Sequence, residues 1–290
     1  MIVDSHAHYA HASFSGSFRY LCWEDNWTLK EGNLEELLEQ MEERGIAMSV
    51  EPGISLDFHE QIFALAARYP GRIFPAAGCH PTRCINEKWS DRKRLLDYCA
   101  RPGVVALGET GLDYHHPREE QHRFKQYLWF LYQLRLAKKL RLPLILHIRD
   151  ADRDAIRVLK LFKPQYGGVV HCCGEGWEFI EEYLKLGLHI GVGGVLLNPA
   201  RNAGLKAAIP KIPLERILVE TDSPYVLPDC KDVLPPKLLR RTRNSSLILP
   251  RVIGEIARLQ GRTPEEVERV TAVNAIGLFR LTSREACENP

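Results

Sequence analysis

Eight short runs of apolar, mostly β-branched residues recur along the chain and alternate with stretches that have the hydrophobic period of a helix. The runs are Ile2–Val3, Ala47–Val50, Ile73–Gly78, Val104–Leu107, Leu144–His147, Gly168–His171, His189–Gly193 and Ile217–Val219. The helical stripes are Leu34, Leu37, Leu38 and Met41; Phe124, Leu128, Leu131 and Leu134; and Ile180, Tyr183, Leu184 and Leu186. Such alternation predicts an α/β fold with parallel strands.

Eight evenly spread strand–helix units favour a closed (β/α)8 TIM barrel in a single domain. A doubly wound open sheet has the same alternation and is the alternative. The length of 290 residues suits one large α/β domain or two small ones. We expect residues 1–283 to form the barrel, closed by helices around Leu249–Leu259 and Pro264–Leu278, and 284–290 to form a polar tail.

The composition excludes several classes of protein. There is no run of about 20 apolar residues that would span a membrane, and no basic segment followed by an apolar one at the start. We therefore expect a cytoplasmic protein with no membrane association, and we infer no obligate protein partner. The net charge of +2 is too small to indicate nucleic-acid binding by itself.

Polar residues follow six of the eight predicted strands. After Ile2–Val3 come His6 and His8, which share one face of a strand and can hold one metal ion from one side. The other five endings are Gly78–Pro81 (GCHP), Gly108–Tyr114 (GETGLDY), His147–Ala151 (HIRDA), His171–Cys173 (HCC) and Glu220–Tyr225 (ETDSPY). Each ending alone is typical of a surface strand terminus. Because burying unpaired charge is costly, all six together indicate a functional site.

These motifs, in this order, resemble the TatD family of metal-dependent hydrolases in the amidohydrolase superfamily, and the resemblance covers nearly the whole chain. It implies a (β/α)8 barrel and divalent-metal-dependent deoxyribonuclease activity. It also implies two divalent metal ions per chain. Imidazole and carboxylate ligands together admit Zn²⁺, Mn²⁺ or Mg²⁺, so the native metal stays open.

The resemblance also assigns roles to individual residues. The implied ligands of the first metal are His6, His8, Glu109 and Asp222, and those of the second are His147, His171 and Glu109. A carboxylate can offer one oxygen to each of two ions, so Glu109 would bridge them. Asp222 would also accept a proton from the attacking water, which makes Asp222 and Glu109 the expected catalytic residues. The alternative role for Asp222 is a helix N-cap before Ser-Pro.

His80 and Arg149 are expected to bind the substrate, because cationic donors beside the metals can neutralise phosphate oxygens. The alternative for Arg149 is a salt bridge with Asp150 or Asp152. Asp113 either orients a ligand histidine through its second ring nitrogen or caps the following turn.

Two long segments, His11–Asn33 and Val226–Ser246, would rise from the face of the barrel that carries the active site. We expect them to frame a substrate groove, with aromatic residues stacking on bases and arginines contacting phosphates. The residues in question are Trp23, Trp27, Arg240, Arg241 and Arg243. Alternatively, the aromatics only seal the barrel and the arginines are only solvated. The chain departs from the family pattern in HCCGEGWEF after strand six and in Ser245-Ser246, where Glu-Pro is usual.

Three functions follow from this reading. The leading one is a phosphodiesterase that acts on DNA, removes nucleotides from an end and uses a metal-bound hydroxide. The alternative is an amidohydrolase or esterase that acts on a small-molecule or aminoacyl substrate with the same metal site. The third is non-catalytic binding by a barrel that has lost its enzymatic activity. It is disfavoured because the ligand set is intact.

Overall fold

The computed structural model describes residues 1–199, 203–231 and 234–282. The expected tail, residues 284–290, lies outside the described residues, and the domain boundary at 283 stays a prediction. Within the described part, none of the helices combines the length and the apolar character that crossing a membrane requires.

The chain forms two compact units. Unit 1 comprises Met1–Ser49, Cys172–Trp177 and Gly191–Ala275. Unit 2 comprises Val50–His171, Glu178–Ile190 and the described part of Ile276–Pro290.

A parallel sheet forms the centre of unit 1. β1 (Ile2–Asp4) pairs in parallel with the first half of β4 (Ile46–Glu51). Directly after β1, Ser5 donates its backbone N–H to the last residue of β10 (Ile217–Val219) at 3.0 Å. Directly after β10, the chain bonds to the end of β9 (His189–Val192). The segments that follow β1 and β10 therefore leave the sheet side by side, and these segments carry His6, His8 and Asp222.

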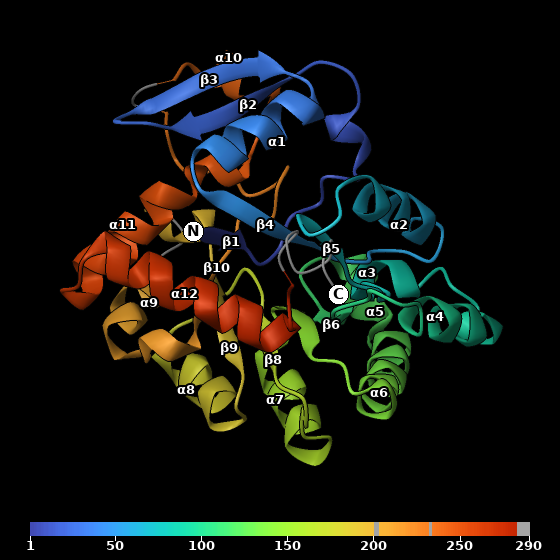
Figure 1. Ribbon diagram of the computed structural model, residues 1–290. Coiled ribbons are helices and arrows are strands. Elements are labelled where there is room, and N and C mark those ends of the chain that lie inside the picture. The colour runs from blue at the N-terminus through green and yellow to red at the C-terminus, as the bar shows by residue number, and fades with distance from the viewer. Residues whose placement is uncertain (200–202, 232–233, 283–290) are drawn as a thin grey trace. The chain divides into compact units, whose positions relative to one another are not determined.

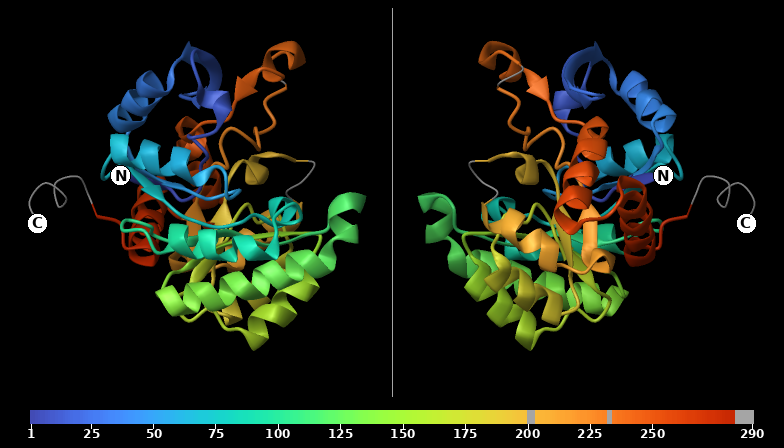
Figure 2. Two further views of the ribbon diagram at one scale, coloured as in Figure 1. Left: turned by 90° about the vertical axis from the view of Figure 1, so that its right-hand side faces the viewer. Right: turned by 90° about the vertical axis from the view of Figure 1, so that its left-hand side faces the viewer.

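The segment after β1 contains a β-hairpin, which the sequence did not predict. β2 (Phe18–Trp23) and β3 (Trp27–Gly32) are antiparallel, with Trp23 opposite Trp27 at the turn. β11 (Thr242–Arg243) pairs in parallel with β2 (Figure 2). Helix α1 (Leu34–Glu43) lies beside the hairpin, and its Gln40 donates to the Tyr20 hydroxyl at 2.6 Å (Figure 1).

Helices complete unit 1. They are α9 (Ala203–Ala208), α10 (Pro236–Leu239), α11 (Leu249–Gln260) and α12 (Pro264–Phe279), with 3-10 turns η1 (Ala12–Phe14), η3 (Gly194–Leu197), η4 (Ile209–Lys211), η5 (Leu214–Arg216) and η6 (Ser246–Ile248). The last turn of α12 belongs to unit 2. Helices α11 and α12 match the two closing helices that the sequence predicts.

Unit 2 is also built on parallel strands. They are the end of β4, β5 (Ile73–Pro75), β6 (Leu107–Asp113), β7 (Leu144–Arg149), β8 (Gly168–Val170) and the start of β9. β7 pairs with β6 on one side and with β8 on the other, and β8 pairs with β9. The helices are α2 (His59–Arg68), α3 (Pro81–Cys84), α4 (Arg92–Cys99), α5 (Pro117–Gln121), α6 (Arg123–Leu140), α7 (Asp152–Leu161) and α8 (Trp177–Lys185), with the 3-10 turn η2 (Trp89–Asp91).

All eight predicted strands occur, and β6 differs most from its prediction. The sequence placed this strand at Val104–Leu107, with the polar GETGLDY motif after it, whereas β6 spans Leu107–Asp113 and all seven residues are buried. Gly111 allows the strand to run through the motif. A Cβ at this position would lie 1.9 Å from the His147 carbonyl oxygen, and the φ of Gly111 is 146°. The GETGLD motif is therefore part of the strand itself.

Helix α6 also differs from its prediction. Phe124, the first residue of the expected apolar stripe, is 75% exposed. The buried face instead carries Gln126 and Gln133 beside Trp129 and Phe130. Buried amides are tolerated only when they are hydrogen-bonded, and both glutamines have partners at strand ends near the site.

Candidate metal centre

His6, His8 and Asp222 meet in unit 1. The Nε2 atoms of His6 and His8 are 3.2 Å apart, and Asp222 Oδ1 lies 3.5 Å from the first and 3.2 Å from the second. Both imidazoles are buried. The backbone N–H of Asp222 donates to His6 O at 2.9 Å, and that of His8 donates to Ser223 O at 2.7 Å. The segments after β1 and β10 are thus joined directly behind the three side chains.

Asp4, at the end of β1, supports this group. Its carboxylate is buried and accepts hydrogen bonds from His6 N (3.2 Å), Thr221 N (3.1 Å), Thr221 Oγ1 (2.6 Å) and Ser246 Oγ (2.5 Å). Burial raises the pKa of Asp4 to about 6, although the hydrogen bonds from Ser246 and Thr221 oppose the rise. Sequence reasoning missed this residue, although it opens the first motif.

Ser245 and Ser246, which stand where Glu-Pro is usual in the family, also help to hold this group in place. Ser246 Oγ donates to Asp4 and lies 2.5 Å from the Tyr9 hydroxyl. Ser245 Oγ donates to Leu21 O in β2 at 2.7 Å and accepts from Leu247 N at the start of η6. These serines therefore connect the hairpin to the residues that position His6.

In unit 2, Glu109 faces three imidazoles. Its Oε2 lies 3.0 Å from His171 Nε2, 3.5 Å from His147 Nδ1 and 3.8 Å from His80 Nε2. His147 Nδ1 and His171 Nε2 are 3.0 Å apart. The Glu109 side chain is 3% exposed. A buried carboxylate and several ring nitrogens thus converge, as in a site for a cation.

Asp113 takes both roles that the sequence left open. Its Oδ2 lies 3.0 Å from His147 Nε2, and its Oδ1 accepts from His115 N in the following turn at 3.0 Å. Burial raises the pKa of Asp113, but the hydrogen bonds from His147 and the His115 N–H, together with the charge of His147, outweigh burial and lower the pKa to about 2. Burial lowers the pKa of His147, but Asp113 and Glu109 outweigh burial and raise it to about 9. Asp113 thus holds a proton on His147 Nε2, and Nδ1 is the nitrogen that faces Glu109 and His171.

The ring of His80 has a different orientation. Its Nδ1 accepts from Thr82 N at 3.1 Å, so His80 caps α3. Burial, together with the charge of His147, lowers the pKa of His80 well below its usual value. A neutral ring whose Nδ1 accepts a hydrogen bond carries its proton on Nε2. The nitrogen nearest Glu109 is then a donor, which suits contact with a substrate oxygen better than metal ligation.

The two buried glutamines of α6 hold the strand ends that carry these residues. Gln126 bonds to both the N–H and the carbonyl of Asp113, each at 2.8 Å. Gln133 bonds in the same way to Cys79, at 2.8 and 3.0 Å, directly before His80. Their spacing of seven residues places them on one helix face, a signal that sequence reasoning did not use.

The donor sets of both groups suit divalent cations. Metal–nitrogen bonds of about 2.0–2.1 Å place neighbouring ligand atoms roughly 3–3.5 Å apart. The three donor atoms of His6, His8 and Asp222 have this separation. In the second unit the donor atoms Glu109 Oε2, His147 Nδ1 and His171 Nε2 lie 3.0–3.5 Å from one another.

Arg149, at the end of β7, is exposed and stands opposite Asp113 in the strand register. The two acids that offered a salt bridge have other partners. Asp150 bonds to His115 at 2.6 Å, and Asp152 accepts from the Tyr183 hydroxyl at 2.6 Å. In the described part of the chain neither forms an ion pair with Arg149.

Residues of both long segments line one polar cavity, and the expected substrate groove stays a prediction. Trp23 and Trp27 pack edge to face at the hairpin turn, with ring centroids 4.8 Å apart. Arg241 and Arg243 line a polar cavity at the other end of the hairpin, and Arg240 is not among its lining residues. Residues 232–233 of the second segment lie outside the described residues.

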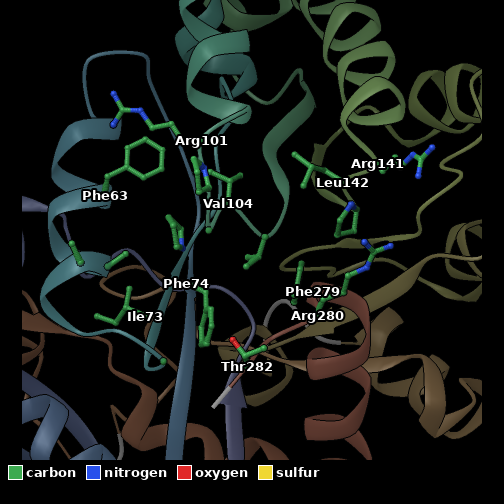
Figure 3. A pocket seen from close by; sticks show the side chains of 18 residues that line it. Phe63, Ile73, Phe74, Arg101, Val104, Arg141, Leu142, Phe279, Arg280 and Thr282 are labelled. Carbon is green, nitrogen blue, oxygen red and sulfur yellow. The ribbon is translucent and has the colours of Figure 1, made fainter. Parts of the chain in front are cut away.

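A larger cavity of about 640 Å³ lies in unit 2, and none of the candidate site residues lines it (Figure 3). Its walls are mainly apolar, with Phe63, Phe74, Leu142 and Phe279 among them. None of the described residues that line it is a histidine, aspartate or glutamate. The described wall therefore offers no imidazole or carboxylate as a metal ligand or general base.

Comparison with known proteins identifies the family. Residues 3–280 match the family model described as TatD related DNase. The 3′-5′ ssDNA/RNA exonuclease TatD of Erwinia billingiae is 35% identical over 248 residues, which is 85% of this chain and 93% of that protein. The protein of the same name from Cronobacter sakazakii is 34% identical over 252 residues, with 84% and 91% covered.

Solved structures agree with this match. The TatD homologue YjjV from Escherichia coli has a TM-score of 0.83 and 25% identity, with 97% of this chain and 98% of that chain covered. A TatD-family hydrolase from Entamoeba histolytica has a TM-score of 0.80 and 21% identity, with the same coverage. The predicted (β/α)8 barrel is thereby confirmed, and the open sheet is excluded. The protein is a hydrolase, and the chain belongs to the family of TatD-related DNases, which depend on metal ions.

Proposed function

We propose that this chain is a divalent-metal-dependent exonuclease that removes nucleotides from the 3′ end of single-stranded DNA or RNA. The observation that carries the proposal is the pair of buried histidine–carboxylate groups, one around Asp222 and one around Glu109. They occur in a chain whose relatives at 34–35% identity bear the name 3′-5′ ssDNA/RNA exonuclease.

In this proposal each group holds one divalent ion. His6, His8 and Asp222 hold the first, and His147 and His171 hold the second together with Glu109. Bound ions would polarise the phosphoryl oxygen and make an attacking water more acidic. The bridging role of Glu109 and the identity of the metal rest on the family resemblance.

The remaining steps belong to side chains of the protein. Asp222 accepts a proton from the attacking water, because its carboxylate is part of the first group, where that water would be activated. Asp113 keeps the proton of His147 on Nε2, so that Nδ1 stays available as a ligand. The Nε2–H of His80 and the guanidinium of Arg149 donate to phosphate oxygens, where negative charge builds up during the reaction.

A carbonyl hydrolase with the same ligands is the less favoured alternative, because the names of the relatives point to phosphodiester substrates. The cytoplasmic location expected from the sequence is part of this proposal, since cellular nucleic acid would be the substrate.

The test is degradation of end-labelled oligonucleotides by the purified protein with added Mn²⁺, Mg²⁺ or Zn²⁺. A 5′-labelled single strand should give a ladder of progressively shorter products, while a 3′-labelled strand should release labelled mononucleotide at once. Chelation and Glu109→Gln should abolish both, whereas Glu43→Gln, on the exposed side of α1, should not. Turnover of carboxylic esters or amides without nucleotide release would contradict the proposal and favour the alternative.

A further inference from the structure

A polar cavity of about 550 Å³ lies in unit 1 at the open end of the β2–β3 hairpin, away from the Trp23–Trp27 pair. Its wall includes three hydroxyl groups and three guanidinium groups, from Ser13, Ser15, Ser17, Arg19, Arg241 and Arg243. Glu31 is the only acid among the described residues that line it. The cavity is therefore built mainly from donors of hydrogen bonds.

The charges in this wall do not balance. Glu31 forms an ion pair with Arg19, which neutralises one of the three arginines. Arg243 is half-buried, and its Nε donates to Ser13 O at 3.4 Å. Arg241 is exposed and has no ion pair within the part of the chain that the structure describes. Two positive charges thus face the cavity without a carboxylate to compensate them.

Short contacts connect the cavity to the first metal group within unit 1. Ser13 N donates to His11 Nδ1 at 3.1 Å, and His11 Nε2 lies 3.3 Å from the hydroxyl of Tyr225. The ring of Tyr225 is in turn 6.0 Å from that of His8. Tyr225 is 45% exposed. A linear polymer whose end lies at the first metal group, and which runs along this row of side chains, passes Tyr225 and His11 and then reaches the cavity.

We propose that this cavity is a subsite for backbone phosphates of the bound strand, upstream of the nucleotide that is being removed. The inference rests on the proposed function and extends it to the part of the substrate that does not react. A planar guanidinium can bind two phosphate oxygens at once, and hydroxyl groups can donate to the same oxygens. Phe18, the aromatic residue in the wall, is only 7% exposed, so the wall offers little surface for base stacking. The subsite therefore binds the strand independently of its sequence.

The experiment measures binding of a fluorescently labelled single strand of about 12 nucleotides to the full chain across a series of salt concentrations, with chelator present to prevent cleavage. Arg241→Ala should weaken binding and lower the magnitude of the log affinity versus log salt slope by about 0.7, the value for one lost phosphate contact in a single strand. Arg241→Lys should keep most of that slope, because it keeps the charge. The matched control is Arg240→Ala, which removes the neighbouring exposed arginine that does not line the cavity.

A second measurement separates this inference from the proposed function. With metal present, Arg241→Ala should raise KM for the long strand more than KM for a dinucleotide, because only the long strand reaches the cavity. If the wild type degrades oligonucleotides but Arg241→Ala keeps the wild-type salt slope, the subsite is refuted and the nuclease proposal stands. An equal fall in slope for Arg240→Ala would also refute the subsite, because that result would indicate general electrostatic attraction and not a local phosphate contact. A wild type that degrades no oligonucleotide would overturn both.

Discussion

His59, in α2, should make the stability of the protein depend on pH in mild acid. Its ring is buried, accepts the Gly78 N–H through Nε2 at 3.1 Å and stacks on the Tyr98 ring with centroids 4.5 Å apart. Burial lowers the pKa of His59 to about 4, and the charges of Arg94 and Arg101 act in the same direction. Gly78 lies two residues before His80, so this hydrogen bond also helps to hold the segment that bears a candidate substrate ligand.

The sign and size of the effect follow from linkage. An unfolded chain protonates His59 as the pH falls through about 6.5, while the folded protein resists until about pH 4. The contribution to the free energy of unfolding is therefore complete above pH 6.5 and is lost between about 6.5 and 4. One pKa unit corresponds to about 1.4 kcal/mol, so the full effect is about 3 kcal/mol and the part lost between pH 7 and pH 5 is about 2 kcal/mol.

Denaturant unfolding at pH 7 and pH 5, in chelator, measures this difference. His59→Gln keeps an acceptor for the Gly78 N–H but does not titrate. The wild type should lose about 2 kcal/mol more than this variant between the two pH values. His116→Gln, at an exposed position, should behave like the wild type. Equal losses in the wild type and His59→Gln would refute the reasoning.

Three further substitutions test other parts of the structure. Asp113→Asn should weaken metal binding about 10–100-fold, because it removes the carboxylate that orients His147; calorimetric titration with Zn²⁺ or Mn²⁺ checks this, and unchanged affinity would contradict it. Asp222→Asn should retain much of the metal but lower turnover by about 10²–10⁴-fold if Asp222 accepts the proton; near-normal turnover with metal bound would remove that role. Gly111→Ala should lower the free energy of unfolding by at least about 2 kcal/mol, because its Cβ would lie 1.9 Å from His147 O; a thermal or denaturant melt equal to that of the wild type would disprove the close approach.

The strand pattern and the polar strand ends were readable from the sequence for a physical reason. Short parallel strands are buried on both faces and read as apolar runs, and ionisable residues at their ends are conspicuous. The strand pattern therefore paired His6 with His8, and the family resemblance added Asp222 to them. The same reasoning placed Glu109 just outside a strand, whereas it lies within β6, where Gly108 and Gly111 interrupt the apolar run.

Other features depend on long-range contacts that a local pattern does not contain. Gln126 and Gln133 look like surface residues in the sequence, and only their bonds to Asp113 and Cys79 explain their burial. The β2–β3 hairpin was not predicted, because β3 carries Lys30 and Glu31 and is only half-buried. The cavity lined by Arg19 and Arg241 brings together residues more than 200 positions apart, so no local sequence motif could predict it.

The most direct test of the account is the number of metal ions bound by each chain. Elemental analysis of the metal-loaded wild type should give two divalent ions per chain. The double variant His6→Ala/His8→Ala should bind one, and His147→Ala/His171→Ala should also bind one, because each pair belongs to a separate group of donors. A wild type with no bound metal, or metal content unchanged in both double variants, would contradict the assignment of these residues as a metal centre.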